Sequence, residues 1–181
     1  MVEWIKVVRA GSYLEDQGLA LRLYRLTDLR PLFRRFTPEV FREASNKSRP
    51  FRSFFAFSKW MMKTFELLYV IEGQGAPQGD PKSRIIGFIG LYNVQAGQRL
   101  WLSIGIFDVR DRSRGYGTKA LALLLDFLQR TVAVKTVHVE VKETNEPSLR
   151  LFRKLGFTVQ QKDGEKGLLR LHKILGPGTE V

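Results

Sequence analysis

The hexapeptide Arg112-Ser-Arg-Gly-Tyr-Gly117 constrains the fold of this chain most, because it stands between a strand-like run and a helix-like run. Apolar residues 100–107 precede it, and residues 118–132 carry apolar side chains at helical spacing. A glycine turn that opens a helix aims free backbone N–H groups, the positive end of the helix dipole and nearby arginines at one point. The sequence therefore predicts a binding site for a phosphate-bearing cofactor at this turn.

The glycine spacing argues against two common phosphate-binding motifs. The turn lacks the G-x-x-x-x-G-K-[ST] spacing of a P-loop, and it also lacks the first glycine of the dinucleotide motif G-x-G-x-x-G. Neither ATP hydrolysis nor nicotinamide chemistry is therefore the favoured interpretation.

Length and composition indicate one globular domain over residues 1–181, since 44% of the 181 residues are hydrophobic. No apolar run reaches the roughly 18 residues of a membrane span, and the N-terminal sequence does not resemble a signal peptide. We expect a soluble, cytoplasmic protein without a membrane partner.

The chain has no cysteine, which excludes disulfides, thiolate metal sites and an acyl-cysteine intermediate. Its two histidines, His138 and His172, each stand in a strand-like alternation and are far apart in the sequence. We therefore expect no metal cofactor.

Hydrophobic periodicity and turn residues predict the order of the elements. The expected strands cover residues 20–26, 66–72, 84–94, 99–107, 135–143, 158–161 and 168–174, with a weaker candidate at 2–8. The expected helices cover residues 29–36, 37–46, 51–64 and 118–132, with a last one from Pro147 to Gly156.

Residues 85–160 resemble the GCN5-related N-acetyltransferases. The turn matches that family's [RQ]-x-x-G-x-[GA] signature, and Asn145-Glu-Pro-Ser-Leu-Arg-Leu-Phe-Arg-Lys-Leu-Gly-Phe157 is similar to its second signature, N-x-x-[AS]-x-x-[LF]-[YF]-x-x-x-G-F. The resemblance implies an α/β (α+β) domain with a mixed, largely antiparallel sheet of six or seven strands and helices on both faces. Residues 20–65 would form the acceptor-side helices and residues 99–157 the acetyl-CoA-binding core.

The resemblance also implies a set of cofactor contacts. The main chain near Gly105 and Phe107 would bind the pantetheine arm, and Thr118 would cap the helix or reach a phosphate oxygen. The pyrophosphate would lie on Arg112, Ser113, Arg114, Gly115, Tyr116 and Gly117. Asn145 and Phe152 occupy family positions that meet the cofactor, although Asn145 also suits a helix cap.

The family's reaction is direct attack of an amine on the thioester of acetyl-CoA in a ternary complex. Many relatives carry a tyrosine where this chain has Phe152, and phenylalanine cannot protonate the leaving thiolate. Ser148 is the substitute acid that we consider, and an ordinary first-turn serine is the alternative. Glu140 is our candidate base, with Glu143 and Asp108 as further candidates, and each also fits a solvated surface carboxylate.

The acceptor side is strongly basic. Residues 22–63 hold 11 lysines and arginines against three acids, which is a net +8 of the chain's total of +12. Eight aromatic residues are interleaved with these cations: Phe33, Phe36, Phe41, Phe51, Phe54, Phe55, Phe57 and Trp60. This surface would suit an anionic or aromatic acceptor, or RNA, better than a polyamine.

Other interpretations of the same region stay open. The aromatic residues would equally form a core beneath a solvated basic face, or an apolar homodimer surface. The favoured function is N-acetyl transfer to a primary amine of a small molecule or of a protein N-terminus. The alternative is a non-catalytic module that kept the CoA fold and binds RNA or a protein partner.

Overall fold

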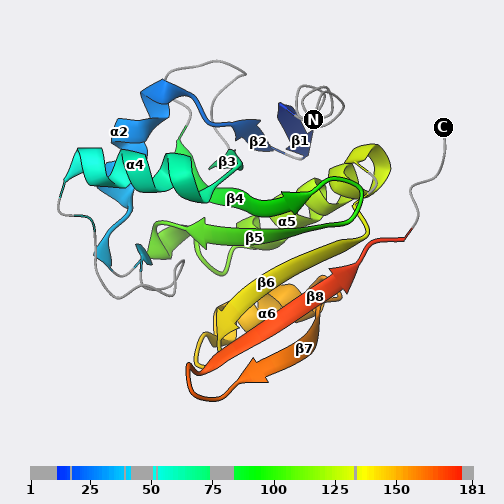
Figure 1. The fold of residues 1–181 in the computed structure, drawn as a ribbon. Coiled ribbons are helices and arrows are strands. Elements are labelled where there is room, and N and C mark those ends of the chain that lie inside the picture. Colours follow the sequence, from blue (N-terminus) through cyan, green and yellow to red (C-terminus); the bar gives the residue numbers. More distant parts are fainter. Residues whose placement is uncertain are drawn as a thin grey trace.

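An eight-stranded sheet forms the centre of the molecule (Figure 1). The computed structural model describes residues 12–16, 18–38, 40–41, 51, 53–73, 84–132 and 134–176. The strands are β1 (Tyr13–Asp16), β2 (Leu19–Leu23), β3 (Leu67–Glu72), β4 (Ile85–Gln95), β5 (Arg99–Ile106), β6 (Thr136–Lys142), β7 (Thr158–Asp163) and β8 (Leu168–Ile174). The helices are α2 (Leu29–Arg35), α4 (Phe54–Thr64), α5 (Tyr116–Phe127) and α6 (Glu146–Lys154), with short turns η1 (Leu26–Asp28) and η2 (Val109–Asp111) and a π-helical end of α5, η3 (Leu128–Val132).

The strands follow the order β1-β2-β3-β4-β5-β6-β8-β7. Among the described strands, β5 and β6 form the one parallel pair, and the chain crosses between them through α5. The predicted mixed, largely antiparallel sheet with helices on both faces is confirmed. It has eight strands rather than six or seven, because residues 13–16 form an additional strand that pairs with β2.

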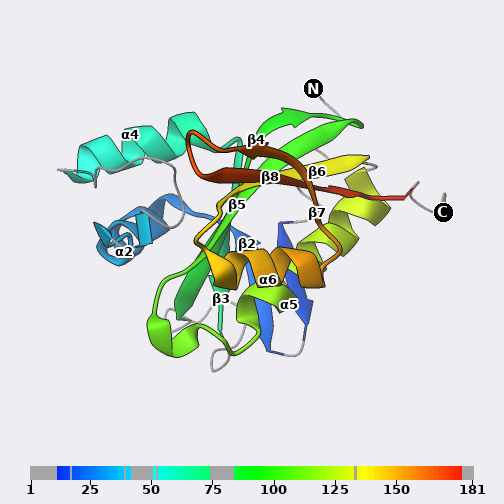
Figure 2. The same ribbon diagram turned by 90° about the horizontal axis from the view of Figure 1, so that it is seen from below.

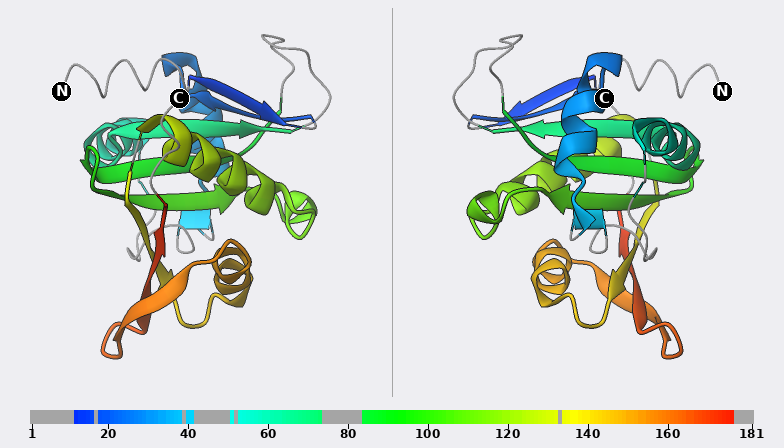
Figure 3. Two further views of the ribbon diagram at one scale, coloured as in Figure 1. Left: turned by 90° about the vertical axis from the view of Figure 1, so that its right-hand side faces the viewer. Right: turned by 90° about the vertical axis from the view of Figure 1, so that its left-hand side faces the viewer.

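Strand alternation sends apolar side chains to both faces of the sheet, and one face packs against α5 and α6. Leu21 and Ile71 belong to the same buried cluster as Leu121 and Leu124 of α5, which lie on the predicted apolar face of that helix. Figures 2 and 3 show α5 and α6 together on this side of the sheet. We call it the α5–α6 face.

The other face packs against α2 and α4 and has a largely aromatic core. Phe36, Phe41 and Phe57 are buried with Val70 and Phe88 of the sheet. The Phe36 ring lies 4.9 Å from that of Phe88 and 5.3 Å from that of Phe57. Most of the interleaved aromatic residues therefore form a core, as one of the sequence interpretations predicted.

Local signals place several helix ends. Ser53 caps α4 by accepting a hydrogen bond from the Ala56 N–H at 3.2 Å, and Thr37 Oγ1 accepts one from Val40 at 3.4 Å, at the start of the helix expected over 37–46. Gly156, with φ +82°, ends α6 as expected. The remainder of the helix expected over 37–46 and the weak strand at 2–8 lie outside the described residues.

Among the residues that the structure covers, no helix is both long and apolar enough to cross a membrane. Figure 3 shows β6, β7, β8 and α6 as one group and β2 to β5 with α5 as another. The parallel contact between β5 and β6 joins the two groups, so the geometry of that contact decides the shape of the space between them.

Candidate active site

A gap opens between β5 and β6, which start side by side and then diverge (Figure 1). The parallel pairing covers only Arg99 with Thr136, Leu100 with Val137 and Trp101 with His138. Both strands continue for several residues beyond the last pair. The edge of β5 that faces this gap can therefore hydrogen-bond an extended ligand, as a neighbouring strand would.

The pairing with β4 decides which backbone groups of β5 face the gap. Phe107 donates its N–H to Ile86 at 2.9 Å across the Gly87–Ile106 pair, which makes that pair the non-hydrogen-bonded kind. Because the two kinds of pair alternate, the backbone groups of Ile104 and Ile106 point into the gap.

This register changes the expected pantetheine contact by one residue. The N–H of Phe107 is used by β4, and Gly105 falls on a hydrogen-bonded pair with Phe88. A Cβ on Gly105 would lie 2.7 Å from the Phe88 ring, so close packing against that ring requires this glycine. The irregularity between β4 and β5 lies between Tyr92 and Gln95 instead of at Gly105.

The glycine turn connects the end of β5 to α5. Ser113 and Gly115 have φ of +61° and +81°, and the Lys119 N–H donates to the Gly115 carbonyl at 2.9 Å to start the helix. Gly115 is thus the N-cap, and Thr118 lies inside the first turn instead of at its start. The N–H groups of Tyr116, Gly117 and Thr118 have no acceptor within the helix and point out of its end.

The two arginines of the turn differ in their surroundings. Arg112 donates from Nε to the Ile106 carbonyl at 3.1 Å and so ties the turn to the end of β5. Arg114 is exposed and forms no ion pair with any other described residue. Arg114 is therefore the arginine that is available to an anion, whereas Arg112 braces the turn.

A cavity of about 340 Å³ lies beside the turn, toward the ends of β3 and β4. Its lining consists of Gly73, Arg84, Ile86, Arg110, Asp111, Arg114 and Tyr116. Asp111 is buried and pairs with Arg84, while Arg110 pairs with Asp108 at 2.7 Å. Two of the three arginines of this cavity thus already have carboxylate partners.

Asp108 is poorly placed to act as a base. The Arg110 side chain and backbone N–H both donate to it, and these contacts hold the pKa of the Asp108 carboxyl well below its usual range. A carboxylate stabilised in this way takes up a proton reluctantly.

Glu140 lies on the opposite side of β6 from α6. Val139 and Val141 are buried with Leu149 of α6, and the alternation of the strand sends Glu140 to the other face. There its carboxylate accepts a hydrogen bond from Arg170 at 3.3 Å, and the Arg170 guanidinium stands 4.9 Å from the centre of the Trp101 ring.

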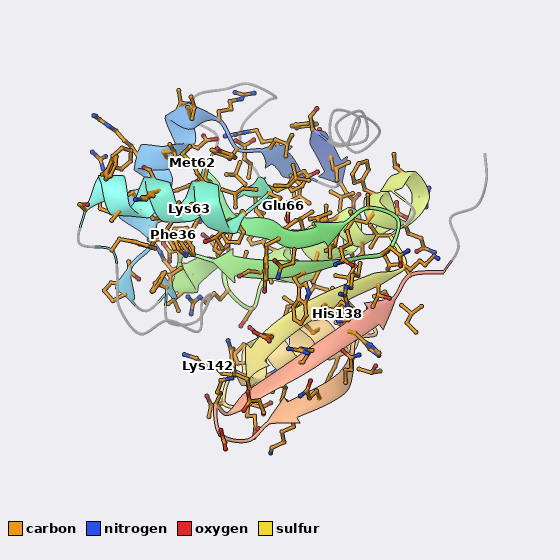
Figure 4. The ribbon with its side chains drawn as sticks, viewed as in Figure 1. Phe36, Met62, Lys63, Glu66, His138 and Lys142 are labelled. Atoms are coloured by element: carbon orange, nitrogen blue, oxygen red, sulfur yellow. The ribbon has the colours of Figure 1, made fainter. Side chains whose placement is uncertain are left out.

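His138, labelled in Figure 4, stacks on Trp101 at the closed end of the gap, with ring centres 4.9 Å apart. Its Nδ1 atom is buried and has no hydrogen-bond partner among the described residues. Burial lowers the pKa of His138, and the nearby His172, Arg99 and Arg170 lower it further. The neutral form of His138 is therefore favoured, beside the carboxylate–arginine pair.

Glu143, just beyond the end of β6, pairs with Lys162 at 2.9 Å, and the remaining candidates lie on α6 or at its start. Asn145 caps this helix by accepting a hydrogen bond from the Ser148 N–H at 3.3 Å. The Phe152 ring is buried and packs against that of Phe157 at 5.2 Å. Ser148 and Glu140 thus belong to opposite sides of β6, and the structure does not bring them together. Within the described part of the chain, no three His, Cys, Asp or Glu side chains are placed to hold a metal ion.

A comparison with protein-family models matches residues 19–158 to the acetyltransferase (GNAT) domain. The chain belongs to the GNAT acetyltransferases. Members of this family are generally acetyl-CoA-dependent, and the residues beside the gap belong to the matched region. No curated protein matches this GNAT sequence.

Solved structures share the fold at low sequence identity. A domain from Methanocaldococcus jannaschii DSM 2661 is 20% identical, with a TM-score of 0.74, and the match covers 88% of this chain and 100% of that one. Spermidine N-acetyltransferase from Vibrio cholerae in complex with CoA and spermine is 16% identical, with a TM-score of 0.71 and coverage of 88% and 97%. The protein yncA from Salmonella typhimurium with its cofactor acetyl-CoA is 16% identical, with a TM-score of 0.67 and coverage of 91% and 98%.

Some parts of this GNAT site were not foreseen from the sequence. The gap-facing backbone of Ile104 and Ile106 depends on the register with β4, for which the sequence offers no signal. The Arg84–Asp111 pair joins residues 27 positions apart. The two histidines, separate in the sequence, lie on neighbouring strands with ring centres 6.1 Å apart.

Proposed function

We propose that this GNAT protein transfers the acetyl group of acetyl-CoA to a primary amine, carried by a small molecule or by a polypeptide N-terminus. One observation carries the proposal: the open edge of β5 leads directly to the glycine turn and the free N–H groups of α5. An extended arm that ends in a pyrophosphate matches both parts of this arrangement.

The residues present fit acetyl-CoA. The backbone of Ile104 and the N–H of Ile106 would hydrogen-bond the pantetheine arm, and the N–H groups of residues 116–118 would bind the pyrophosphate with Arg114. Asn145 at the start of α6 would contact the arm from the far side of the gap. Acetyl-CoA, when bound, supplies an activated thioester carbonyl.

The chain's own residues would contribute positioning and proton transfer. Glu140 is proposed to take the proton that an acceptor ammonium must lose before its nitrogen can attack. Ser148 is proposed as the donor of a proton to the departing sulfur, from the other side of β6. The backbone groups beside the gap hold the reacting carbonyl in place and stabilise negative charge on its oxygen.

Calorimetric titration with acetyl-CoA and with CoA is the first test. We expect micromolar binding, and at least a tenfold loss of affinity in Arg114→Glu, because that change puts a carboxylate beside the pyrophosphate. Arg153→Glu is the matched control, since Arg153 is also exposed but lies at the far end of α6. No binding at millimolar acetyl-CoA would refute the proposed cofactor.

Transfer is tested with a panel of primary amines that includes peptides with free N-termini. In Glu140→Gln, kcat should fall strongly while the Kd for acetyl-CoA stays unchanged, because the proposed role concerns only the proton of the acceptor. Acetyl-CoA binding without transfer to any amine would instead favour the non-catalytic module.

A further inference from the structure

The helices α2 and α4 carry an unusual concentration of positive charge. They hold five cations, Arg30, Arg34, Arg35, Lys59 and Lys63, and no acidic residue. None of the five forms an ion pair or a side-chain hydrogen bond with another described residue. The charge of this pair of helices is therefore not neutralised by the part of the protein that the structure describes.

Cations elsewhere are often held by carboxylates. Arg22 binds Asp28 at 2.7 Å, Lys162 binds Glu143 at 2.9 Å, and Arg170 binds Glu140 at 3.3 Å. The contrast marks α2 and α4 as a surface whose counter-charge does not come from the described residues. Such a surface attracts a polyanion.

The outer side of α4 also exposes apolar side chains among its cations. Phe55 is 76% exposed and Met62 64% exposed. Phe55, Lys59, Met62 and Lys63 recur at the spacing of one helix side, while Phe57 and Met61 face the core. An exposed ring one turn from a lysine offers a flat surface next to a positive charge.

The two helices contact each other. The Phe33 ring of α2 meets the Phe54 ring of α4 at 5.7 Å, edge to face. Arg30 and Arg34 of α2, one turn apart and both exposed, add two cations to those of α4. We define the α2–α4 surface as Arg30, Arg34, Phe55, Lys59, Met62 and Lys63; Figure 4 labels the last two on α4.

We propose that the α2–α4 surface binds single-stranded nucleic acid, independently of acetyl-CoA. Closely spaced cations suit phosphates, and an exposed phenylalanine suits an unstacked base. A single strand offers both groups at once, whereas a duplex hides its base faces and an acidic polypeptide has no flat ring to match each charge. The aromatic residues that are buried beneath the surface hold the helices in place and are not available for stacking.

Fluorescence anisotropy with labelled single strands of about 15 nucleotides, oligouridylate and oligothymidylate, tests the proposal. The full chain is titrated at several salt concentrations. With about four phosphates neutralised, affinity should fall roughly 50-fold between 50 and 200 mM salt. Binding of both strands assigns the surface to single-stranded nucleic acid in general, and a preference for oligouridylate assigns it to RNA.

Two sets of variants locate the binding. Lys59→Glu with Lys63→Glu should weaken binding at least tenfold and lower the salt slope by about 1.4 through the loss of two phosphate contacts. Phe55→Ala should weaken binding about tenfold at every salt concentration and leave the slope unchanged. The matched control is Lys135→Glu with Lys154→Glu, an equal change of charge at two exposed lysines outside α2 and α4.

Three results would overturn the proposal. The first is that the control pair loses as much affinity as the α4 pair. The second is that a duplex or oligoglutamate of the same length binds as tightly as a single strand. The third is that no single strand binds at low salt. Acetyl-CoA titration and thermal unfolding of each variant separate a loss of this surface from a loss of the fold, since both readouts should stay at wild-type values for Phe55→Ala.

Discussion

At the scale of single residues, the two glycines of the turn serve different physical needs. Gly115 has φ +81° with open space around its Cα, so only its backbone conformation requires glycine. A Cβ on Gly117 would lie 2.9 Å from Leu151 Cδ1, so the Leu151 side chain of α6 would have to shift for a larger residue. One glycine shapes the turn, and the other makes room for a side chain of α6.

Gly115→Ala should therefore lower the free energy of unfolding by about 1 kcal/mol, the cost of placing an ordinary residue in the left-handed region. Gly115→Asn should cost less, because asparagine tolerates that region. Urea unfolding measures both. Gly164→Ala is the control, since a Cβ there meets nothing within 4 Å and its φ is not positive, and it should leave stability unchanged. An equal loss at Gly164 would contradict this account.

His138 should make the protein less stable in mild acid. Its pKa is lowered by burial and by His172, Arg99 and Arg170, so the unfolded chain binds a proton below about pH 6.5 that the folded chain resists. The free energy of unfolding should fall as the pH drops below 6.5, by up to about 1.4 kcal/mol per pH unit until the lowered pKa is reached. His138→Phe keeps a ring against Trp101 and should flatten the profile just below pH 6.5. A variant with the wild-type slope would show that other groups cause it.

At the scale of elements, the order of helices and strands was predictable from periodicity and turn residues. The start of α5 was placed two residues late, because a left-handed glycine cap leaves no side-chain signal. The strand at 13–16 was missed, since its four residues, Tyr-Leu-Glu-Asp, are too few and too polar to show a pattern. Which backbone groups of β5 face the gap could not be predicted, because strand register depends on the partner strand.

Asn145 at the start of α6 allows a cap to be separated from a cofactor contact. Asn145→Ala should lower the free energy of unfolding by about 1 kcal/mol, because the Ser148 N–H loses its acceptor. Asn145→Asp keeps a cap and should retain stability. If the amide also contacts the cofactor, both variants lose acetyl-CoA affinity in calorimetry, and unchanged affinity in both would leave Asn145 as a cap only.

At the scale of the whole molecule, the proposed cofactor binding and the proposed nucleic acid binding use different regions. The glycine turn and the gap bring the proposed cofactor to β5, α5 and α6, whereas the α2–α4 surface lies over the opposite face of the sheet (Figure 2). A change on α4 should therefore leave acetyl-CoA binding intact. The same surface concentrates like charges in a protein whose formal charge is +12, which disfavours the compact state.

Reversing charge on α4 should therefore stabilise the fold while it weakens nucleic acid binding. Lys59→Glu with Lys63→Glu lowers the formal charge from +12 by two for each change, to +8. At low salt the variant should unfold at a higher Tm than the wild type, because repulsion from Arg30, Arg34 and Arg35 is relieved. The difference in Tm should shrink in 0.5 M NaCl, where salt limits the repulsion between exposed charges to a few ångströms.

The pair Lys135→Glu with Lys154→Glu is the control for net charge alone, and its Tm should rise less. A lower Tm for the α4 variant at low salt would show that the cations of α2 and α4 do not repel one another appreciably in the fold.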